Sequence, residues 1–198
     1  MIRQVELQDA KAITNIYNEY VLQSVATFDT EPVLEEEMRT RIAEISSRFP
    51  YFVYEENQEI TGYCYAHTWK ERSAYRYTLE TTVYLSPGHT GKGIGMLLMK
   101  KLIGACRESG YRVLIACITE GNEASNILHE KLGFKQVSHF KKGRLKVRPL
   151  AGCRRLRTSA DPGLRLKESL KITCLTSIPS PSWKGYDKRY HKIAAQVP

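Results

Sequence analysis

The chain has 198 residues, 42% of them hydrophobic, and a formal net charge of +9. This length and composition are typical of one globular domain and exclude a chain that lacks a hydrophobic core. The charge is uneven, because residues 1–140 carry 15 Lys and Arg against 18 Asp and Glu, whereas residues 141–198 carry 15 against 3. We therefore expect a mildly acidic domain over residues 1–142 and a basic, poorly ordered tail over residues 143–198.

The cysteines and the apolar segments indicate a reducing compartment. The five cysteines are an odd number and form no C-x-x-C pair, which argues against a disulfide framework and a zinc site. No basic segment followed by an apolar run opens the chain, and Lys100 and Lys101 interrupt the apolar stretch 94–106. We expect a cytoplasmic protein with no membrane segment and no metal.

The first fifty residues predict a short strand and two helices. Ile2–Val5 is a candidate strand, and Asp9 can cap a helix with apolar residues at helical spacing up to Gln23. A polar loop containing Thr27 and Phe28 leads to a second helix over Leu34–Phe49. Its acidic first turn, E-E-E, is typical of a helix start rather than of a metal site.

A run of β-rich segments follows. Residues 51–54 and 60–69 are joined by the polar turn E-E-N-Q-E and predict a hairpin, and residues 75–85 predict a third strand. Alternation within this third strand places Glu80 on one face together with Thr78, Thr82 and Tyr84. Glu80 is thus a carboxylate in the middle of an otherwise apolar strand.

The remaining elements predict the fold class. Residues 93–109 have a helical apolar stripe, residues 113–118 form a nearly continuous apolar strand, residues 122–132 are helical and residues 135–140 are strand-like. This order predicts an α/β (α+β) domain with a mixed, mostly antiparallel sheet flanked by helices. Parallel pairing enters through the crossover helix that follows Leu85.

The stretch Thr82–Met99 indicates an anion site. It passes from strand through S-P-G to three alternating glycines, Gly91, Gly93 and Gly95, and then into a helix. Glycines allow a backbone to approach a ligand closely, and a helix N-terminus offers unpaired N–H groups at a positive dipole end. The G-x-G-x-G spacing differs from those of the P-loop and the dinucleotide-binding fold.

Several motifs carry a family resemblance over residues 1–140. V-Y-L-S-P-x-x-x-G-K-G-I-G, followed about thirty residues later by N-E-A-S-N-I-L-H-E-K-L-G-F, resembles the Gcn5-related N-acetyltransferase (GNAT) superfamily. The segments I-Y-N-E-Y, A-T-F-D-T-E-P-V and A-Y-R-Y-T-x-E-x-x-V-Y-L resemble the phosphinothricin and methionine sulfoximine acetyltransferases. The resemblance implies a GNAT fold and transfer of an acetyl group from acetyl-CoA to the primary amine of a small amino-acid-like substrate.

The resemblance also implies roles for individual residues. Glu80 matches the carboxylate that takes a proton from the acceptor amine, and such a base is needed because an ammonium group cannot attack a thioester. The residues implied to bind the coenzyme are Val83, Tyr84, Leu85, Gly91, Lys92, Gly93, Ile94, Gly95, Met96, Asn122, Ser125 and Lys131. The residues implied to border the acceptor are Thr27, Phe28, Ser73, Ala74, Tyr75 and Arg76.

Simpler interpretations of these residues stay open. Glu80 could be a structural partner of a nearby Arg or Tyr, Arg76 could be a surface charge, and Asn122 could be an ordinary helix cap. His129 is more typical of a packed helix residue than of a catalyst. The loop has Thr90 where the family usually has Arg or Gln, so we expect weaker coenzyme binding.

The C-terminal stretch departs from the family. The family continues after Phe140 with a pattern like V-G-x-K-F-G-R-W-L-D-V-V, whereas this chain reads G-R-L-K-V-R-P-L-A-G-C-R-R-L-R from Gly143. Reading fourfold-degenerate codons one nucleotide later permits V-G-L-K-F-G-R-W-L-D-V-V-V-Y, so we hypothesise a frameshift, which the coding DNA tests. We expect the final strand to be replaced by an irregular basic tail that leaves unpaired edges beside the strands near Val113 and Lys135, although Leu170–Ile178 alternates as a possible substitute.

Two functions from different classes follow. The favoured one is an acetyl-CoA-dependent enzyme with a small-molecule amine substrate, no membrane partner and, by family resemblance, a homodimeric state. The alternative is a non-catalytic GNAT-fold protein whose basic tail binds nucleic acid or acidic surfaces. Aromatic and basic residues in the tail are not regularly interleaved, which disfavours nucleic acid.

Overall fold

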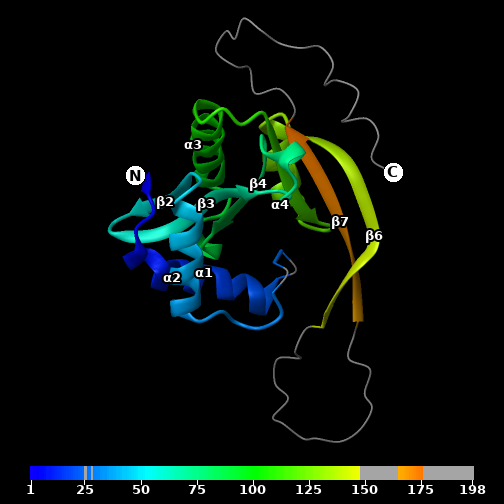
Figure 1. The fold of residues 1–198 in the computed structure, drawn as a ribbon. Coiled ribbons are helices and arrows are strands. Elements are labelled where there is room, and N and C mark those ends of the chain that lie inside the picture. The colour runs from blue at the N-terminus through cyan, green and yellow to red at the C-terminus, as the bar shows by residue number, and fades with distance from the viewer. Residues whose placement is uncertain (25, 28, 148–164, 176–198) are drawn as a thin grey trace, which may run out of the picture.

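A computed structural model describes residues 1–24, 26–27, 29–147 and 165–175. Four α-helices and seven strands form the described part, with short 3-10 turns between them (Figure 1). In chain order these elements are β1 (Ile2–Gln4), α1 (Ala10–Gln23), α2 (Glu35–Ser46), β2 (Tyr51–Glu56), β3 (Glu59–Thr68), β4 (Thr78–Leu85), α3 (Ile94–Glu108), β5 (Val113–Thr119), α4 (Glu123–Lys131), β6 (Lys135–Val147) and β7 (Arg165–Leu175). The predicted helices and the strands up to β5 are confirmed to within a few residues.

One sheet of seven strands organises the molecule, in the order β1-β2-β3-β4-β5-β7-β6. Every neighbouring pair is antiparallel except β4 and β5, which are parallel because α3 carries the chain across from one strand to the next. The mixed sheet flanked by helices is therefore confirmed. Residues 73–75, of which Tyr75 was predicted to begin the strand, instead form a 3-10 turn before β4.

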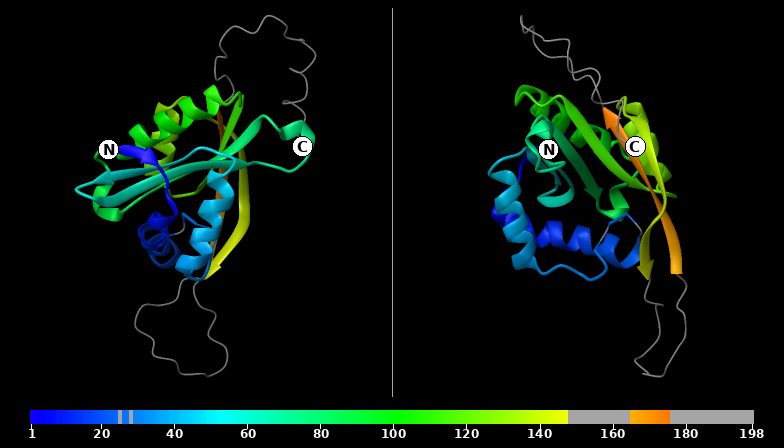
Figure 2. Two further views of the ribbon diagram at one scale, coloured as in Figure 1. Left: turned by 60° about the vertical axis from the view of Figure 1, so that its left-hand side comes forward. Right: turned by 45° about the vertical axis from the view of Figure 1, so that its right-hand side comes forward.

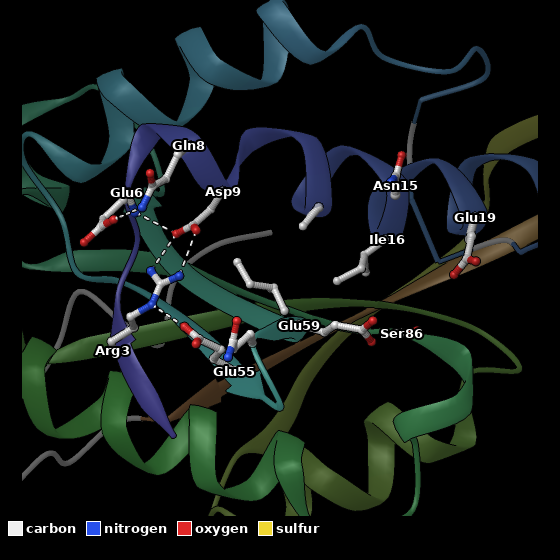
Figure 3. Close-up of a pocket in the computed structure, with 13 residues that line it drawn as sticks. Arg3, Glu6, Gln8, Asp9, Asn15, Ile16, Glu19, Glu55, Glu59 and Ser86 are labelled. Atoms are coloured by element: carbon white, nitrogen blue, oxygen red, sulfur yellow. Dashed lines mark hydrogen bonds and ion pairs between the residues drawn. The ribbon is translucent and has the colours of Figure 1, made fainter.

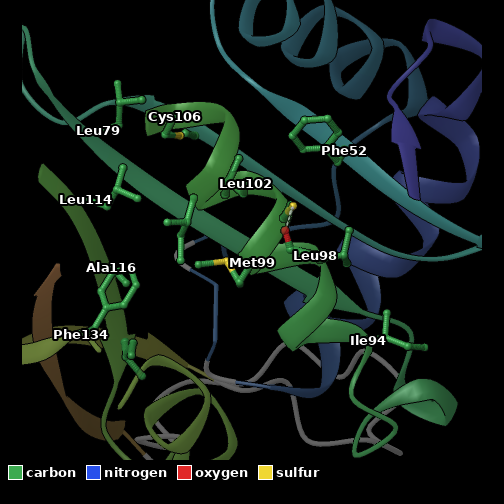
Figure 4. Packing of buried hydrophobic residues seen from close by; sticks show 14 residues of the cluster. Phe52, Leu79, Ile94, Leu98, Met99, Leu102, Cys106, Leu114, Ala116 and Phe134 are labelled. Carbon is green, nitrogen blue, oxygen red and sulfur yellow. Dashed lines mark hydrogen bonds between the residues drawn. The ribbon is translucent and has the colours of Figure 1, made fainter. Parts of the chain in front are cut away.

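The two faces of the sheet have separate cores. Residues at odd positions of β4, such as Leu79, pack with Leu98, Met99 and Leu102 of α3 in a core whose members are nearly all inaccessible to water (Figure 4). The other face holds Tyr63 and Val53 against α1 and α2. Figure 2 shows α3 on one side of the sheet and the α1–α2 pair on the other. This division puts Glu80, an even position, on the α1–α2 face.

The strands near Val113 and Lys135 do not have the unpaired edges that the sequence predicted, because β7 pairs with both. Residues 170–175 of the possible substitute segment Leu170–Ile178 belong to β7. β7 lies between β5 and β6 and pairs antiparallel with both, from Leu114↔Leu175 on one side and Lys135↔Cys174 on the other (Figure 1). β6 also continues to Val147, beyond the expected end of the folded domain at residue 142. Residues 148–164 and 176–198, which include most of the expected tail, lie outside the described residues.

Asp9 plays a different part from the helix cap that the sequence predicts. Its carboxylate makes no capping bond to α1 and instead accepts two hydrogen bonds from the Arg3 guanidinium, both 2.8 Å, and one from the Glu6 N–H, also 2.8 Å. Arg3 also donates to Glu55 at 2.7 Å. This network joins β1, β2 and the start of α1, and it explains why a charged residue that is only 5% exposed is tolerated there.

Candidate active site

The two parallel strands separate where Glu80 lies. Pairing between β4 and β5 covers Thr78↔Val113, Leu79↔Leu114 and Glu80↔Ile115 and then ends, although both strands continue. Where the ladder ends, the Thr81 hydroxyl donates to the Ile115 carbonyl at 3.1 Å. Residues 81–85 of β4 and 116–119 of β5 are not paired with each other, and we call the gap between them the β4–β5 opening.

The backbone of β4 presents unpaired groups to this opening. The Ser86 N–H donates to the Thr61 carbonyl at 2.9 Å, so Ser86 faces β3. The Tyr77 carbonyl accepts from the N–H groups of Arg112 and Val113, so Tyr77 faces β5. Because successive residues of a strand point their polar groups to opposite edges, Thr81, Val83 and Leu85 face β5. The Leu85 carbonyl is taken by the Tyr20 hydroxyl at 2.6 Å, which leaves the Val83 backbone groups and the Leu85 N–H for a ligand.

Glu80 lies at the vertex of the opening, among polar side chains. Its Oε2 atom is 3.9 Å from Nε2 of His67, the residue directly opposite on β3. Burial and the nearby Glu80 carboxylate raise the pKa of Cys117, on β5, to about 12. The Glu80 side chain is 22% exposed, so the carboxylate is accessible from the α1–α2 face while most of the side chain is covered.

The glycine-rich turn has the geometry of an anion site. Gly91 and Gly93 have φ values of +76° and +83°, which favour glycine, and Gly93 is the N-cap of α3. The Leu97 N–H donates to the Gly93 carbonyl at 3.1 Å and so closes the first turn of the helix. The N–H groups of Ile94, Gly95 and Met96 therefore lack intrahelical acceptors by helix geometry. Lys92 is exposed between the two glycines.

Ile94 and Gly95 of the glycine-rich turn also take part in packing. The Ile94 side chain is 4% exposed, so only its backbone can reach a ligand. A Cβ at Gly95 would lie 3.3 Å from Leu128 Cδ2 of α4 and 3.6 Å from Leu85 Cδ1 of β4, which shows how closely three elements meet there. The Thr90 hydroxyl donates to the Pro87 carbonyl at 3.1 Å, so its hydrogen is used within the turn.

The α4 residues combine capping with the predicted coenzyme contact. The side-chain oxygen Oδ1 of Asn122 accepts from the Ser125 N–H at 3.2 Å, so Asn122 is a helix cap. Its side-chain NH₂ is the part that could donate to a ligand. Ser125 lies 3.3 Å from His129 Nδ1 through its hydroxyl. His129 itself is 3% exposed and packs edge-on against Phe134, as expected for a packed helix residue. Lys131 is exposed at the end of α4.

The predicted acceptor residues fall into two groups. Ser73, Ala74 and Tyr75 form the turn between β3 and β4, at the end of the sheet next to Glu80. Thr27 is 1% exposed, and its hydroxyl lies 2.6 Å from that of Tyr17, so it supports the α1–α2 loop from inside. Phe28 lies outside the described residues.

Arg76 is exposed beside the aromatic ring of Tyr77. Its guanidinium carbon is 4.8 Å from the ring centroid, and the Arg76 side chain lowers the pKa of the Tyr77 hydroxyl by hydrogen bonding to it. Arg112 lies over the same ring at 5.0 Å. Arg76 thus directly follows the turn of residues 73–75, with its guanidinium against the Tyr77 ring.

Sequence reasoning missed three residues that shape this site. The pairing of β3 with β4 brings His67 next to Glu80, and the fold brings the Tyr20 hydroxyl to the Leu85 carbonyl. Local sequence patterns predict neither contact. A Cβ at Gly62 would collide with the Leu85 side chain and lie 3.2 Å from the Tyr84 carbonyl, so glycine is needed for β3 to approach the end of β4. A glycine inside a strand pattern was the one available signal.

A polar groove of about 790 Å³ lies elsewhere, between α1 and the β2–β3 hairpin (Figure 3). The Arg3, Asp9 and Glu55 network occupies one end of it, and Asn15, Glu19 and Ser86 lie toward the other (Figure 3). None of its lining residues is a predicted site residue, and the Arg3 network pairs its charges with one another. We assign it a structural role.

Neither a metal centre nor a membrane-spanning helix is found in the described part of the chain. Among the described residues, no group of three or more His, Cys, Asp or Glu side chains is arranged to hold a metal ion. Within the same ranges, no helix has the length and apolar character required to cross a bilayer.

Known proteins are similar to this chain in sequence and in structure. The family model of the acetyltransferase (GNAT) domain matches residues 2–147. The chain is 40% identical over 142 residues to the phosphinothricin N-acetyltransferase of Alcaligenes faecalis, covering 71% of this chain and 72% of that protein. It is 39% identical over 137 residues to the L-methionine sulfoximine/L-methionine sulfone acetyltransferase of Salmonella typhimurium, covering 67% and 78%.

Structural similarity agrees with these sequence relationships. The crystal structure of a GNAT superfamily phosphinothricin acetyltransferase from Sinorhizobium meliloti in complex with AcCoA matches with a TM-score of 0.79 and 31% identity. The match covers 98% of this chain and 96% of that one. The chain therefore belongs to the GNAT acetyltransferase family.

Proposed function

We propose that this protein transfers the acetyl group of acetyl-CoA to the primary amine of a small amino-acid-like substrate of the phosphinothricin or methionine sulfoximine type. The observation that carries the proposal is Glu80, a carboxylate at the vertex of the β4–β5 opening, next to the unpaired backbone groups of Val83 and Leu85. The names of the relatives support both the donor and the acceptor class.

The residues of the opening fit a thioester donor. A strand N–H from Val83 or Leu85 would donate to the thioester carbonyl and stabilise the negative charge that develops on its oxygen. The glycine turn and the first N–H groups of α3 would bind the pyrophosphate, with Lys92 adding a positive charge. Asn122, Ser125 and Lys131 would contact the coenzyme from α4.

Glu80 would supply the base for the acceptor. The substrate ammonium gives a proton to the Glu80 carboxylate, and the free amine then attacks the thioester carbon. A C–N bond forms as the C–S bond breaks. The attacking nitrogen gives up its second proton, and the departing thiolate takes up a proton to become the coenzyme A thiol. Residues 73–76 and the loop that Thr27 supports would border the acceptor, with Arg76 available to bind its acidic group.

We also propose a homodimeric state, supported by the family resemblance, and a cytoplasmic location, supported by the four described cysteines, which are all free thiols. The alternative of a nucleic-acid-binding scaffold depends on residues 143–198, most of which lie outside the described residues, and the relatives named above lend it no support.

An acetyl-CoA thiol-release assay over a panel of amines tests the function. Phosphinothricin, methionine sulfoximine and methionine sulfone should be turned over, and Glu80→Gln should lower kcat by about 10²–10⁴-fold, the usual contribution of a general base. Glu108→Gln, an exposed carboxylate at the far end of α3, is the matched control and should retain full activity. Equal kcat values for Glu80→Gln and the unmodified chain would rule out the proposed base.

A further inference from the structure

Glu80 has three titratable neighbours that the proposed reaction does not use. His67 faces it from β3, and Cys117 approaches it from β5. Tyr65, two residues before His67 on the same face, lies with its ring centroid 5.8 Å from that of His67. The base therefore lies in a small set of groups that could exchange a proton with it.

The tautomer of His67 follows from its hydrogen bonding. Nδ1 lies 3.0 Å from the Thr68 carbonyl oxygen, and since a carbonyl only accepts, Nδ1 carries a hydrogen. In the neutral ring Nε2 then has a free lone pair. Nε2 faces Glu80 and lies 3.9 Å from its Oε2. A small rotation of either side chain, or one bridging water, would bring the two atoms into hydrogen bonding.

The other two neighbours cannot take a proton at neutral pH. Burial raises the pKa of the Tyr65 hydroxyl, and burial together with Glu80 raises the pKa of the Cys117 thiol to about 12, so both groups stay protonated. Thr82, opposite Tyr65 on β4, has a hydroxyl that does not titrate. Of these neighbours of Glu80, His67 is therefore the one with a lone pair available to accept the proton.

Exposure gives the proton a route to solvent. The His67 side chain is 35% exposed and the Glu80 side chain 22% exposed, so the imidazole can pass a proton on to water. Glu80 must lose its acquired proton before every new turnover, because a protonated carboxyl cannot serve as a base.

We propose that His67 is a positioning residue that acts through Glu80 and restores its carboxylate after each turnover. The inference rests on the proposed function. The Glu80 carboxyl O–H bond breaks as the proton binds Nε2, the ring becomes an imidazolium held by Thr68 through Nδ1–H, and Nε2–H then gives the proton to water. Glu80 and the ring both return to their starting states.

Kinetics of His67 variants in a weakly buffered acetyl-CoA assay test this relay. His67→Gln and His67→Ala should lower kcat by about 10–100-fold with little change in KM, less than the loss for Glu80→Gln, because solvent offers a slower route from a partly exposed carboxyl. Rising imidazole concentration should restore the kcat of His67→Ala and leave that of the unmodified chain unchanged. Adding His67→Gln to Glu80→Gln should cause no further loss.

His139→Gln is the matched control, because His139 makes a similar pair with Glu120, Nε2 to Oε1 at 3.8 Å, on another part of the sheet. It should keep the kcat and the imidazole independence of the unmodified chain. Imidazole-independent kcat in both His67 variants, or an additive loss in the double variant, would overturn the relay while the proposed function stands. Absence of turnover by the unmodified chain with every amine would overturn both.

Discussion

Gly62 offers a sharp test of how the end of β4 is built. A Cβ at this position would overlap Cδ2 of Leu85 and would lie 3.2 Å from the Tyr84 carbonyl and 3.3 Å from Leu98 Cδ1. The Leu85 side chain would have to rotate away, and the β4 backbone and the packed Leu98 side chain would each have to give by a few tenths of an ångström. Gly62→Ala should therefore cost about 1–3 kcal/mol of unfolding free energy by overpacking, which lowers Tm by roughly 2–10 °C in a chain of this length.

The same change should affect function, because it presses on the Tyr84 carbonyl and the Leu85 side chain, next to the Leu85 N–H that faces the β4–β5 opening. We expect a raised KM for acetyl-CoA beside the lowered Tm. Gly104→Ala is the control, since Gly104 lies within α3 and a Cβ there would meet no atom of another element within 4 Å. That variant should gain about 0.5–1 kcal/mol from helix propensity. Thermal melts followed by circular dichroism that give Gly62→Ala an unchanged or higher Tm would refute the packing argument.

Two further predictions concern stability. Asp9→Asn removes the negative charge that binds Arg3 and should lower the free energy of unfolding in urea by about 3 kcal/mol. This value is at the low end for a broken buried pair, because the Arg3 side chain is 25% exposed. Glu36→Gln, at an exposed pair with Arg39, is the control and should cost less than about 0.5 kcal/mol. Burial lowers the pKa of His129 in the folded state, so the unfolded chain binds more protons below about pH 6.5, and stability should fall as pH drops through that range. Melts of His129→Gln between about pH 7.5 and 5 should show a shallower fall; an identical slope would contradict the assignment.

Local pattern was enough to predict the helices and the strands up to β5. The apolar stripe of residues 93–109 predicted a helix that the structure bounds at Ile94–Glu108, and the continuous apolar run 113–118 proved to be a largely buried strand. Alternation alone put Glu80 on the opposite face from Leu79. These predictions succeed because burial against a sheet enforces periods of 2 and 3.6 directly on the sequence.

Features that depend on how strands meet could not be predicted. His67 stands opposite Glu80 because β3 and β4 pair in the register that joins Tyr63 to Tyr84, and nothing within either segment specifies that register. The β4–β5 opening likewise follows from pairing that ends at Ile115. Asp9 is a residue type that often caps helices. Here the Arg3 guanidinium of β1 binds its carboxylate through two charge-assisted hydrogen bonds, which are stronger than a capping bond to the α1 backbone.

The position of β7 shows that neighbouring strands can fix the structure of a segment whose own sequence pattern is weak. Leu114, Ala116 and Ile118 of β5 are buried, so an unpaired β5 edge would leave backbone groups without partners, each at a cost of about 1–3 kcal/mol. A strand beside β5 is therefore favoured even where its own pattern is weak. Thr173 fits this view, since its hydroxyl donates to the Ala116 carbonyl at 3.4 Å. A frameshift, which the coding DNA still has to test, would then change which residues occupy this position and not whether the sheet requires a strand there.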